Sequence, residues 1–215
     1  MRSRDDIAVH ERDGSGSARR GGRHSPAARA LLRRWPTALA LALTLPGLIT
    51  GIVSEGSGTA GDAVGVHGEI LPLLPLLYVI VHQAGKPRVT WPLLGGSLVV
   101  VFGLLAQEVV SPSGVLVGVA LVVLLWGALR GTPHGRAVFG VQAVGAVVFC
   151  ALALVGLAVD PDLGRFVVAA GWLFHGVWDF VHLRARRLEG VVAPSFAEWC
   201  GVVDVVVAVE LLFLP

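Results

Sequence analysis

The stretch GRFVVAAGWLFHGVWDFVHL, from Gly164 to Leu183, decides the fold class. It has the length of about 20 residues that a helix needs to cross the hydrocarbon core of a bilayer. It is mainly apolar, yet its second half contains His175, Asp179 and His182. Ionisable side chains are costly inside a membrane and usually face the interior of a helical bundle. The stretch therefore predicts a membrane-spanning helix that carries a polar site.

The composition of the whole chain supports the membrane class. Of 215 residues, 54% are hydrophobic and only 15% are charged, and the mean hydropathy is +0.75. A soluble domain carries roughly 25% charged residues. The formal net charge is +2, which is too small to indicate a nucleic-acid partner. The bilayer is the expected environment, and the backbone hydrogen bonds must then close within helices.

Seven apolar segments near the spanning length follow one another along the chain. They cover residues 35–53, 63–83, 89–108, 114–130, 136–159, 164–183 and 196–214. We therefore expect an all-α, polytopic membrane protein, with a bundle of about seven transmembrane helices over residues 35–215. Pro46, Pro72 and Pro75 lie within these segments and should kink or locally unwind them. Residues 1–34 are polar and rich in Arg, Gly and Ser, which predicts a disordered basic tail.

The charges of the connecting loops alternate along the chain. Basic residues collect in the N-terminal tail and in every second loop, namely Lys86, Arg88, Arg130, Arg136, Arg184, Arg186 and Arg187. Loops rich in Lys and Arg lie in the cytoplasm. The pattern predicts a multi-pass protein of the cell membrane with the N-terminus in the cytoplasm and the C-terminus outside.

The polar residues of the sixth segment form a stripe that the seventh segment extends. His175, Asp179 and His182 are spaced by four and three residues, which places them on one narrow face of a helix. In the seventh segment, Cys200 and Asp204 are four residues apart on one face. Consecutive helices joined by a short loop tend to pack antiparallel. We expect His175, Asp179, His182 and Asp204 to converge in the inner half of the membrane.

Imidazole nitrogens and carboxylate oxygens together suit Zn or Fe. The predicted metal ligands are His175, Asp179, His182 and Asp204. Without a metal, the same residues supply an acid/base pair, so the predicted catalytic residues are His175, Asp179 and Asp204. Glu69, in the outer half of the second apolar segment, is a further catalytic candidate. A simpler interpretation stays open, in which these groups only form hydrogen bonds between neighbouring helices.

Three classes of function fit this pattern. The first is an intramembrane enzyme whose lipid-like or isoprenoid substrate enters from the bilayer, through metal-assisted hydrolysis or acid/base cyclisation or isomerisation. The second is a proton- or ion-coupled transporter that uses the same residues as a relay. The third is a scaffold in a larger membrane complex. A polar cluster confined to one half of the membrane favours an enzyme, whereas a polar file through both halves favours transport.

The motif GWLFHGVWDFVH, followed by Pro-Ser and then by CGVVD, resembles the C-terminal part of an uncharacterised family of small bacterial multi-pass membrane proteins. The matching positions are Gly171, Trp172, His175, Trp178, Asp179, His182, Pro194, Ser195, Cys200 and Asp204. The sequence departs from the family pattern by one histidine in place of a pair, and by a longer and more basic loop between the two helices. The resemblance implies a shared site and no reaction. A weaker similarity of architecture is to alkaline ceramidases, seven-span hydrolases with His and Asp ligands around zinc.

Overall fold

The computed structural model describes residues 34–53, 60–107 and 109–213, and within these ranges the chain contains helices and no strands. The α-helices are α2 (Trp35–Val53), α3 (Ala60–Ile70), α4 (Leu73–Ala84), α5 (Thr90–Gln107), α6 (Pro112–Arg130), α7 (Arg136–Ala158), α8 (Pro161–Arg184) and α9 (Pro194–Phe213). Two short 3-10 helices, η1 (Pro87–Val89) and η2 (Arg186–Leu188), lie in the connections. The predicted tail, residues 1–34, lies outside the described residues except for Arg34.

The predicted all-α, polytopic membrane fold is confirmed. Five helical segments are long and apolar enough to cross a membrane: Gly61–Ala84, Pro87–Gln107, Pro112–Arg130, Arg136–Ala158 and Pro161–Arg184. Helix α2 is also apolar, but the part of it whose side chains are described, Trp35–Thr50, is shorter than these five segments. Helix α9 has 20 residues and carries Glu198, Asp204 and Glu210. The helix bounds match the seven predicted segments one to one, except that the second segment corresponds to α3 and α4 together.

The second segment is broken at Leu71–Pro72, where a turn separates α3 from α4. This agrees with the expectation for Pro72, because proline has no backbone N–H to donate to the preceding turn of a helix. Pro46 lies inside α2 without ending it, and Pro75 lies in the first turn of α4, where a missing N–H is tolerated. The two halves have different neighbours, since α3 packs on α7 and α8, and α4 packs on α6 and α7.

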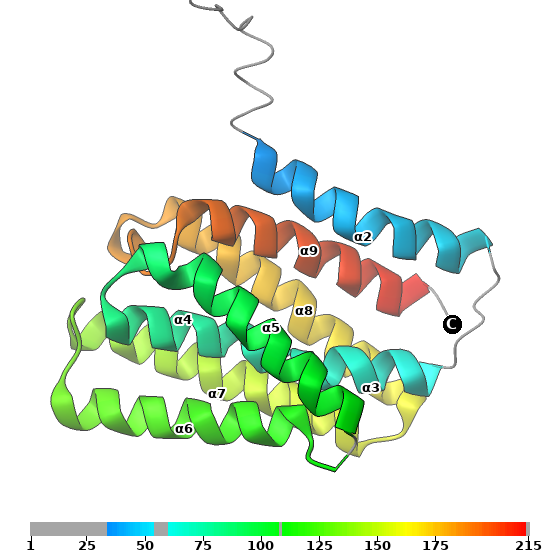
Figure 1. Ribbon diagram of the computed structural model, residues 1–215, viewed down its shortest axis with the longest axis horizontal. Coiled ribbons are helices and arrows are strands. Elements are labelled where there is room, and N and C mark those ends of the chain that lie inside the picture. Colours follow the sequence, from blue (N-terminus) through cyan, green and yellow to red (C-terminus); the bar gives the residue numbers. More distant parts are fainter. Residues whose placement is uncertain (1–33, 54–59, 108, 214–215) are drawn as a thin grey trace, which may run out of the picture. The chain divides into compact units, whose positions relative to one another are not determined.

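Helices α8 and α9 form the most extensive helix pair, and α9 lies between α8 and α2 (Figure 1). At the beginning of α9, the Glu198 carboxylate accepts hydrogen bonds from Thr37 Oγ1 and from Arg34 Nη1, the latter at 3.2 Å. These contacts fix the start of α2 beside the start of α9. The loop joining α8 to α9 lies at the same end of the bundle, which we call the α8–α9 loop end.

Glycines allow α7 and α8 to approach closely at their junction. A Cβ atom at Gly164 would lie 2.4 Å from the carbonyl oxygen of Gly156, and a Cβ atom at Gly156 would lie 2.5 Å from Val168 Cγ2. The first of these obstacles is backbone, which cannot rotate away. Small residues at such crossings are typical of membrane helix pairs.

We expect Gly164→Ala to destabilise the protein by about 1–3 kcal/mol, because the added methyl group overpacks the crossing. The free energy of unfolding would be measured by denaturant titration in detergent micelles. Gly95→Ala in α5 is the matched control, since a Cβ atom there meets nothing within 4 Å. Equal stability of the two variants would contradict the close packing of α7 on α8.

Candidate metal centre

The site is built where α8 crosses α9, and two glycines set the distance between the helices. A Cβ atom at Gly176 would lie 3.2 Å from Asp204 Cβ and 3.2 Å from the carbonyl oxygen of Gly201. A Cβ atom at Gly201 would lie 3.2 Å from Asp179 Cβ. The absence of side chains at these two positions brings the polar stripe of α8 onto the polar face of α9.

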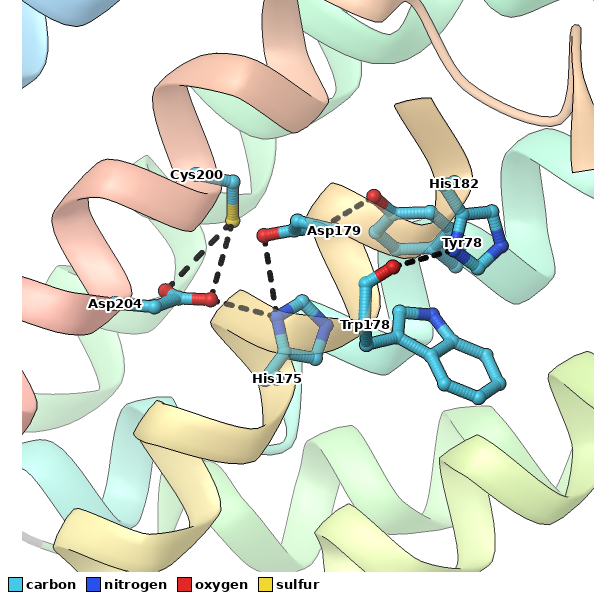
Figure 2. A network of polar contacts seen from close by, with 7 residues as sticks. All are labelled: Tyr78, His175, Trp178, Asp179, His182, Cys200 and Asp204. Atoms are coloured by element: carbon cyan, nitrogen blue, oxygen red, sulfur yellow. Dashed lines mark hydrogen bonds and ion pairs between the residues drawn. The ribbon is translucent and has the colours of Figure 1, made fainter. Parts of the chain in front are cut away.

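Four potential ligands converge at this crossing (Figure 2). His175 Nδ1 lies 2.7 Å from Asp204 Oδ2 and 3.5 Å from Asp179 Oδ2. Cys200 Sγ lies 3.9 Å and 4.0 Å from the two Asp204 carboxylate oxygens. One ligand atom from each of the four residues lies within 4.8 Å of every other. The structure therefore confirms that His175, Asp179 and Asp204 meet.

The cluster is sealed from solvent. The exposed fraction is 0% for His175, Asp179 and Asp204 and 1% for Cys200. Aromatic rings cover the His175 imidazole, with centroids at 4.9 Å for Phe149 and 5.7 Å for Tyr78. A site of this kind has a low local dielectric, so charges inside it interact more strongly than in water.

Tyr78 of α4 adds a third helix to the site, because its hydroxyl donates a hydrogen bond to Asp179 Oδ1. The second carboxylate oxygen, Oδ2, has no hydrogen-bond partner among the described residues, and neither has His175 Nε2. A buried acceptor without a donor is unfavourable. Tyr78 therefore holds Asp179 by one oxygen and leaves the other directed toward the His175 ring.

The donor set suits a transition metal. Zinc binds Cys sulfur at about 2.3 Å, His nitrogen at about 2.0–2.1 Å and carboxylate oxygen at about 2.0–2.2 Å, so neighbouring ligand atoms in a tetrahedral site lie roughly 3.3–3.8 Å apart. The separations of 2.7, 3.5 and 3.9 Å bracket this range. Small side-chain movements that separate His175 Nδ1 from Asp204 Oδ2 would make room for an ion. The buried His/Asp/Cys group could therefore hold a metal.

His182, a predicted ligand, lies apart from this group although it is on the same helix. Its Nδ1 donates to the carbonyl oxygen of Trp178 at 2.9 Å, and its Nε2 accepts from the Gln142 amide at 2.9 Å. Both ring nitrogens are thus occupied. Cys200 takes the fourth position in the cluster. The spacing of four residues predicts that Cys200 shares a helix face with Asp204, and this spacing is the sequence signal for a ligand that was not among the predicted ones.

Glu69 belongs to the last turn of α3 and is not one of the clustered residues. Its Oε2 accepts the backbone N–H of Ser113 at 2.6 Å and the Ser111 hydroxyl at 3.1 Å. These donors belong to the first turn of α6 and its cap. A carboxylate there satisfies an unpaired N–H and interacts favourably with the helix dipole. In this structure the contacts of Glu69 are those of a helix cap.

Glu69→Ala is therefore expected to lower the free energy of unfolding by about 1–2 kcal/mol, through loss of this cap. Because Glu69 touches none of the four clustered residues, the metal content is expected to stay the same. Chemical unfolding and elemental analysis of one preparation test both statements. Glu210→Ala is the control, since Glu210 has no cap contact within the described ranges. Loss of metal in Glu69→Ala would contradict the cap role.

The polar network is concentrated toward the α8–α9 loop end. His175 and Asp179 belong to the second half of α8 and Cys200 to the first half of α9, while Tyr78 and Asp204 lie near the middle of α4 and α9. Toward the other end, Nδ1 of the His67 ring lies 2.8 Å from the carbonyl oxygen of Ala63, one turn earlier in α3, and the Trp172 indole donates to the His67 carbonyl oxygen at 3.2 Å. Among the described residues, the polar groups around His175 thus form one cluster, and the contacts of Glu69 at the start of α6 are a separate helix cap.

No family model matches the sequence, and no curated protein or solved structure shows significant similarity to the chain. The functional argument therefore rests on the geometry of the site.

Proposed function

We propose that this protein is a metal-dependent intramembrane enzyme that acts on a lipid-like or isoprenoid substrate from the bilayer. The observation that carries the proposal is the buried cluster at the α8–α9 crossing, in which an imidazole, a thiol and two carboxylates lie within 4.8 Å of one another. Four polar groups are more than one interhelical bond requires, and each is costly to bury in a membrane protein. Their concentration in one part of the bundle favours an enzyme over a transport relay.

We assign different roles to the two carboxylates. His175, Cys200 and Asp204 would hold zinc or ferrous iron, which leaves one position open for substrate or water. A bound ion supplies Lewis acidity toward a carbonyl or phosphoryl oxygen. Asp179 faces the same space through its free Oδ2 and would transfer a proton, while Tyr78 fixes its orientation. Hydrolysis and acid/base isomerisation are both compatible with these roles.

The surroundings of the site support a hydrophobic substrate. A surface cavity of about 370 Å³ is lined by Val177, Phe180, Val181, Arg184 and Ala185 of α8 and its end. The Phe180 ring separates this apolar hollow from the crossing, since its Cζ would lie 3.1 Å from a Cβ atom at Gly201. Movement of one aromatic side chain would join the hollow to the cluster. We propose this hollow as the entry route of a substrate dissolved in the bilayer.

We further propose that the protein lies in the cell membrane with its N-terminus in the cytoplasm. The basic loops support this orientation, because Lys86, Arg130 and Arg184 all lie at or near the ends of helices that point the same way. The cluster then lies in the cytoplasmic half of the membrane, with the hollow beside Phe180 in the same half.

The first experiment measures metal content. The protein is purified in detergent, and Zn, Fe, Mn and Cu are quantified by plasma mass spectrometry beside the Asp179→Ala/Asp204→Ala double variant. We expect about one ion per chain in the wild type and nearly none in the double variant, with circular dichroism showing that both are folded. The metal-loaded protein is then incubated with a bacterial lipid extract, and the products are followed by mass spectrometry.

Each outcome has a clear meaning. Metal and turnover together support the enzyme. Metal without any turnover would indicate a structural centre, and a chain that binds no metal in either form would overturn the metalloenzyme. A folded, metal-free protein that carries protons across vesicle membranes would favour the transporter.

A further inference from the structure

A second site lies between α4, α6 and the loop that joins α6 to α7. It is a cavity of about 560 Å³. Its apolar wall includes Ile80, Val123 and Trp126, and its polar wall includes Gln83, Arg130 and Thr132. None of these residues belongs to the candidate metal centre. Both helices end here, with α4 ending at Ala84 and α6 at Arg130, so the cavity lies at the α8–α9 loop end of the bundle.

The polar wall contains donors that nothing in the described part of the chain satisfies. Gln83 Nε2 and Thr132 Oγ1 are buried and have no hydrogen-bond partner there. Arg130 has no carboxylate within ion-pairing distance among the same residues. A buried donor without an acceptor is unfavourable, and native structures pair the great majority of such groups. The cavity therefore presents an exposed cation, and its wall holds two buried donors that side-chain rotation would turn toward the acceptors of a ligand.

Two histidines behind this wall extend the unsatisfied region. The rings of His82 and His134 stack with centroids 5.0 Å apart. Both nitrogens of His82 and Nδ1 of His134 have no hydrogen-bond partner among the described residues. His82 is completely buried, and His82 and His134 are chain neighbours of the cavity residues Gln83 and Pro133. Three further polar atoms without partners thus belong to chain neighbours of these two cavity residues.

The apolar wall continues onto a surface suited to acyl chains. Trp126 is 62% exposed, Leu125 is 62% exposed and Leu129 is 76% exposed on α6. These side chains face outward from a helix that is apolar enough to span a membrane. Tryptophan at the level of an arginine near a helix end is typical of the membrane interface. A molecule in the cavity would have its polar group beside Arg130 and its hydrocarbon along α6.

We propose that this cavity binds the phosphate headgroup of an anionic phospholipid. Arginine recognises phosphate oxygens through parallel hydrogen bonds, and the Gln83 amide and Thr132 hydroxyl supply further donors. None of the described residues that line the cavity is acidic, so a choline or ethanolamine ammonium finds no counter-charge among them. The apolar wall favours a lipid over free phosphate. The site is independent of the proposed enzyme activity.

The test uses the full chain in a zwitterionic detergent with native mass spectrometry. Phosphatidylglycerol and phosphatidylcholine with the same acyl chains are added in separate titrations, and inorganic phosphate is added in a third. We expect the wild type to retain one phosphatidylglycerol per chain, at least tenfold more strongly than phosphatidylcholine. Arg130→Gln and Thr132→Val should each reduce this retention several-fold or more.

Arg88→Gln is the matched control, because Arg88 is an exposed arginine of η1 near the same end of the bundle and outside the cavity. It should bind phosphatidylglycerol like the wild type, and all variants should melt at the wild-type temperature. Equal retention of the two lipids would overturn the proposal. So would unchanged binding in both Arg130→Gln and Thr132→Val, or displacement of the lipid by millimolar inorganic phosphate, which would indicate an anion site.

Discussion

Replacing Cys200 by serine is expected to weaken zinc binding by about a hundredfold or more, whereas the same replacement of Cys150 leaves it unchanged. A thiolate is a softer and stronger zinc ligand than a hydroxyl. Cys200 Sγ lies 3.9 Å from Asp204 Oδ1 inside the cluster. Cys150 is also buried, with an exposed fraction of 7%, but lies on α7 and does not belong to the group. The two variants therefore separate coordination from the general effect of losing a buried sulfur.

Zinc affinity would be measured by competition with a chromophoric chelator in detergent, after removal of the purified protein's own metal. The two cysteine variants should have similar melting temperatures in the absence of metal. If Cys200→Ser and Cys150→Ser bind zinc equally well, the thiol is not a ligand. The centre would then have to use His175 with the two carboxylates.

The second large effect is expected from Asp179→Asn, which should lower turnover by about 10²–10⁴-fold while the metal stays bound. Asparagine keeps the size of the side chain and an oxygen for the Tyr78 hydroxyl, but it cannot accept and return a proton. The measurement compares product formation per bound metal ion, using the substrate identified in the lipid extract. Asp204→Asn serves as the comparison, because loss of a ligand should remove the metal and the activity together.

Tyr78→Phe gives an independent check on the role assigned to Asp179. The variant removes the hydrogen bond to Oδ1 and leaves the carboxylate in place. A smaller loss of turnover than in Asp179→Asn, with full metal content, is expected for a positioning residue. Loss of metal in Asp179→Asn would instead identify Asp179 as a ligand. Full turnover in Asp179→Asn would exclude it from proton transfer.

The helical elements and three of the four clustered residues could be predicted from the sequence, because both depend on short-range rules. Apolar segments of spanning length determine the helices, and Pro72 marks the break between α3 and α4. His175 and Asp179 share a helical face by their spacing of four residues. Asp204 meets them because α8 and α9 are consecutive and antiparallel, which required only a short connecting loop.

The rest of the site depends on the depth of the helix crossing, which spacing does not determine. His182 points to the same side as His175, but it lies about 10 Å further along the helix axis at 1.5 Å per residue. The crossing at Gly176 and Gly201 is level with His175 and Asp179, so the partners on α9 are too far from His182. The contribution of Tyr78 depends on α4 lying close enough to α8 for the Tyr78 hydroxyl to reach Asp179, and no local pattern predicts that approach.

All four clustered side chains belong to a single helical hairpin, since α8 ends at Arg184 and α9 begins at Pro194. Closing so short a connection costs little conformational entropy, and contacts between residues near in sequence form early in folding. The hairpin can therefore assemble its ligands as soon as both helices have entered the membrane, while Tyr78 docks from an earlier part of the chain. During biosynthesis, capture of an ion would then help to lock the hairpin before the bundle has closed around it.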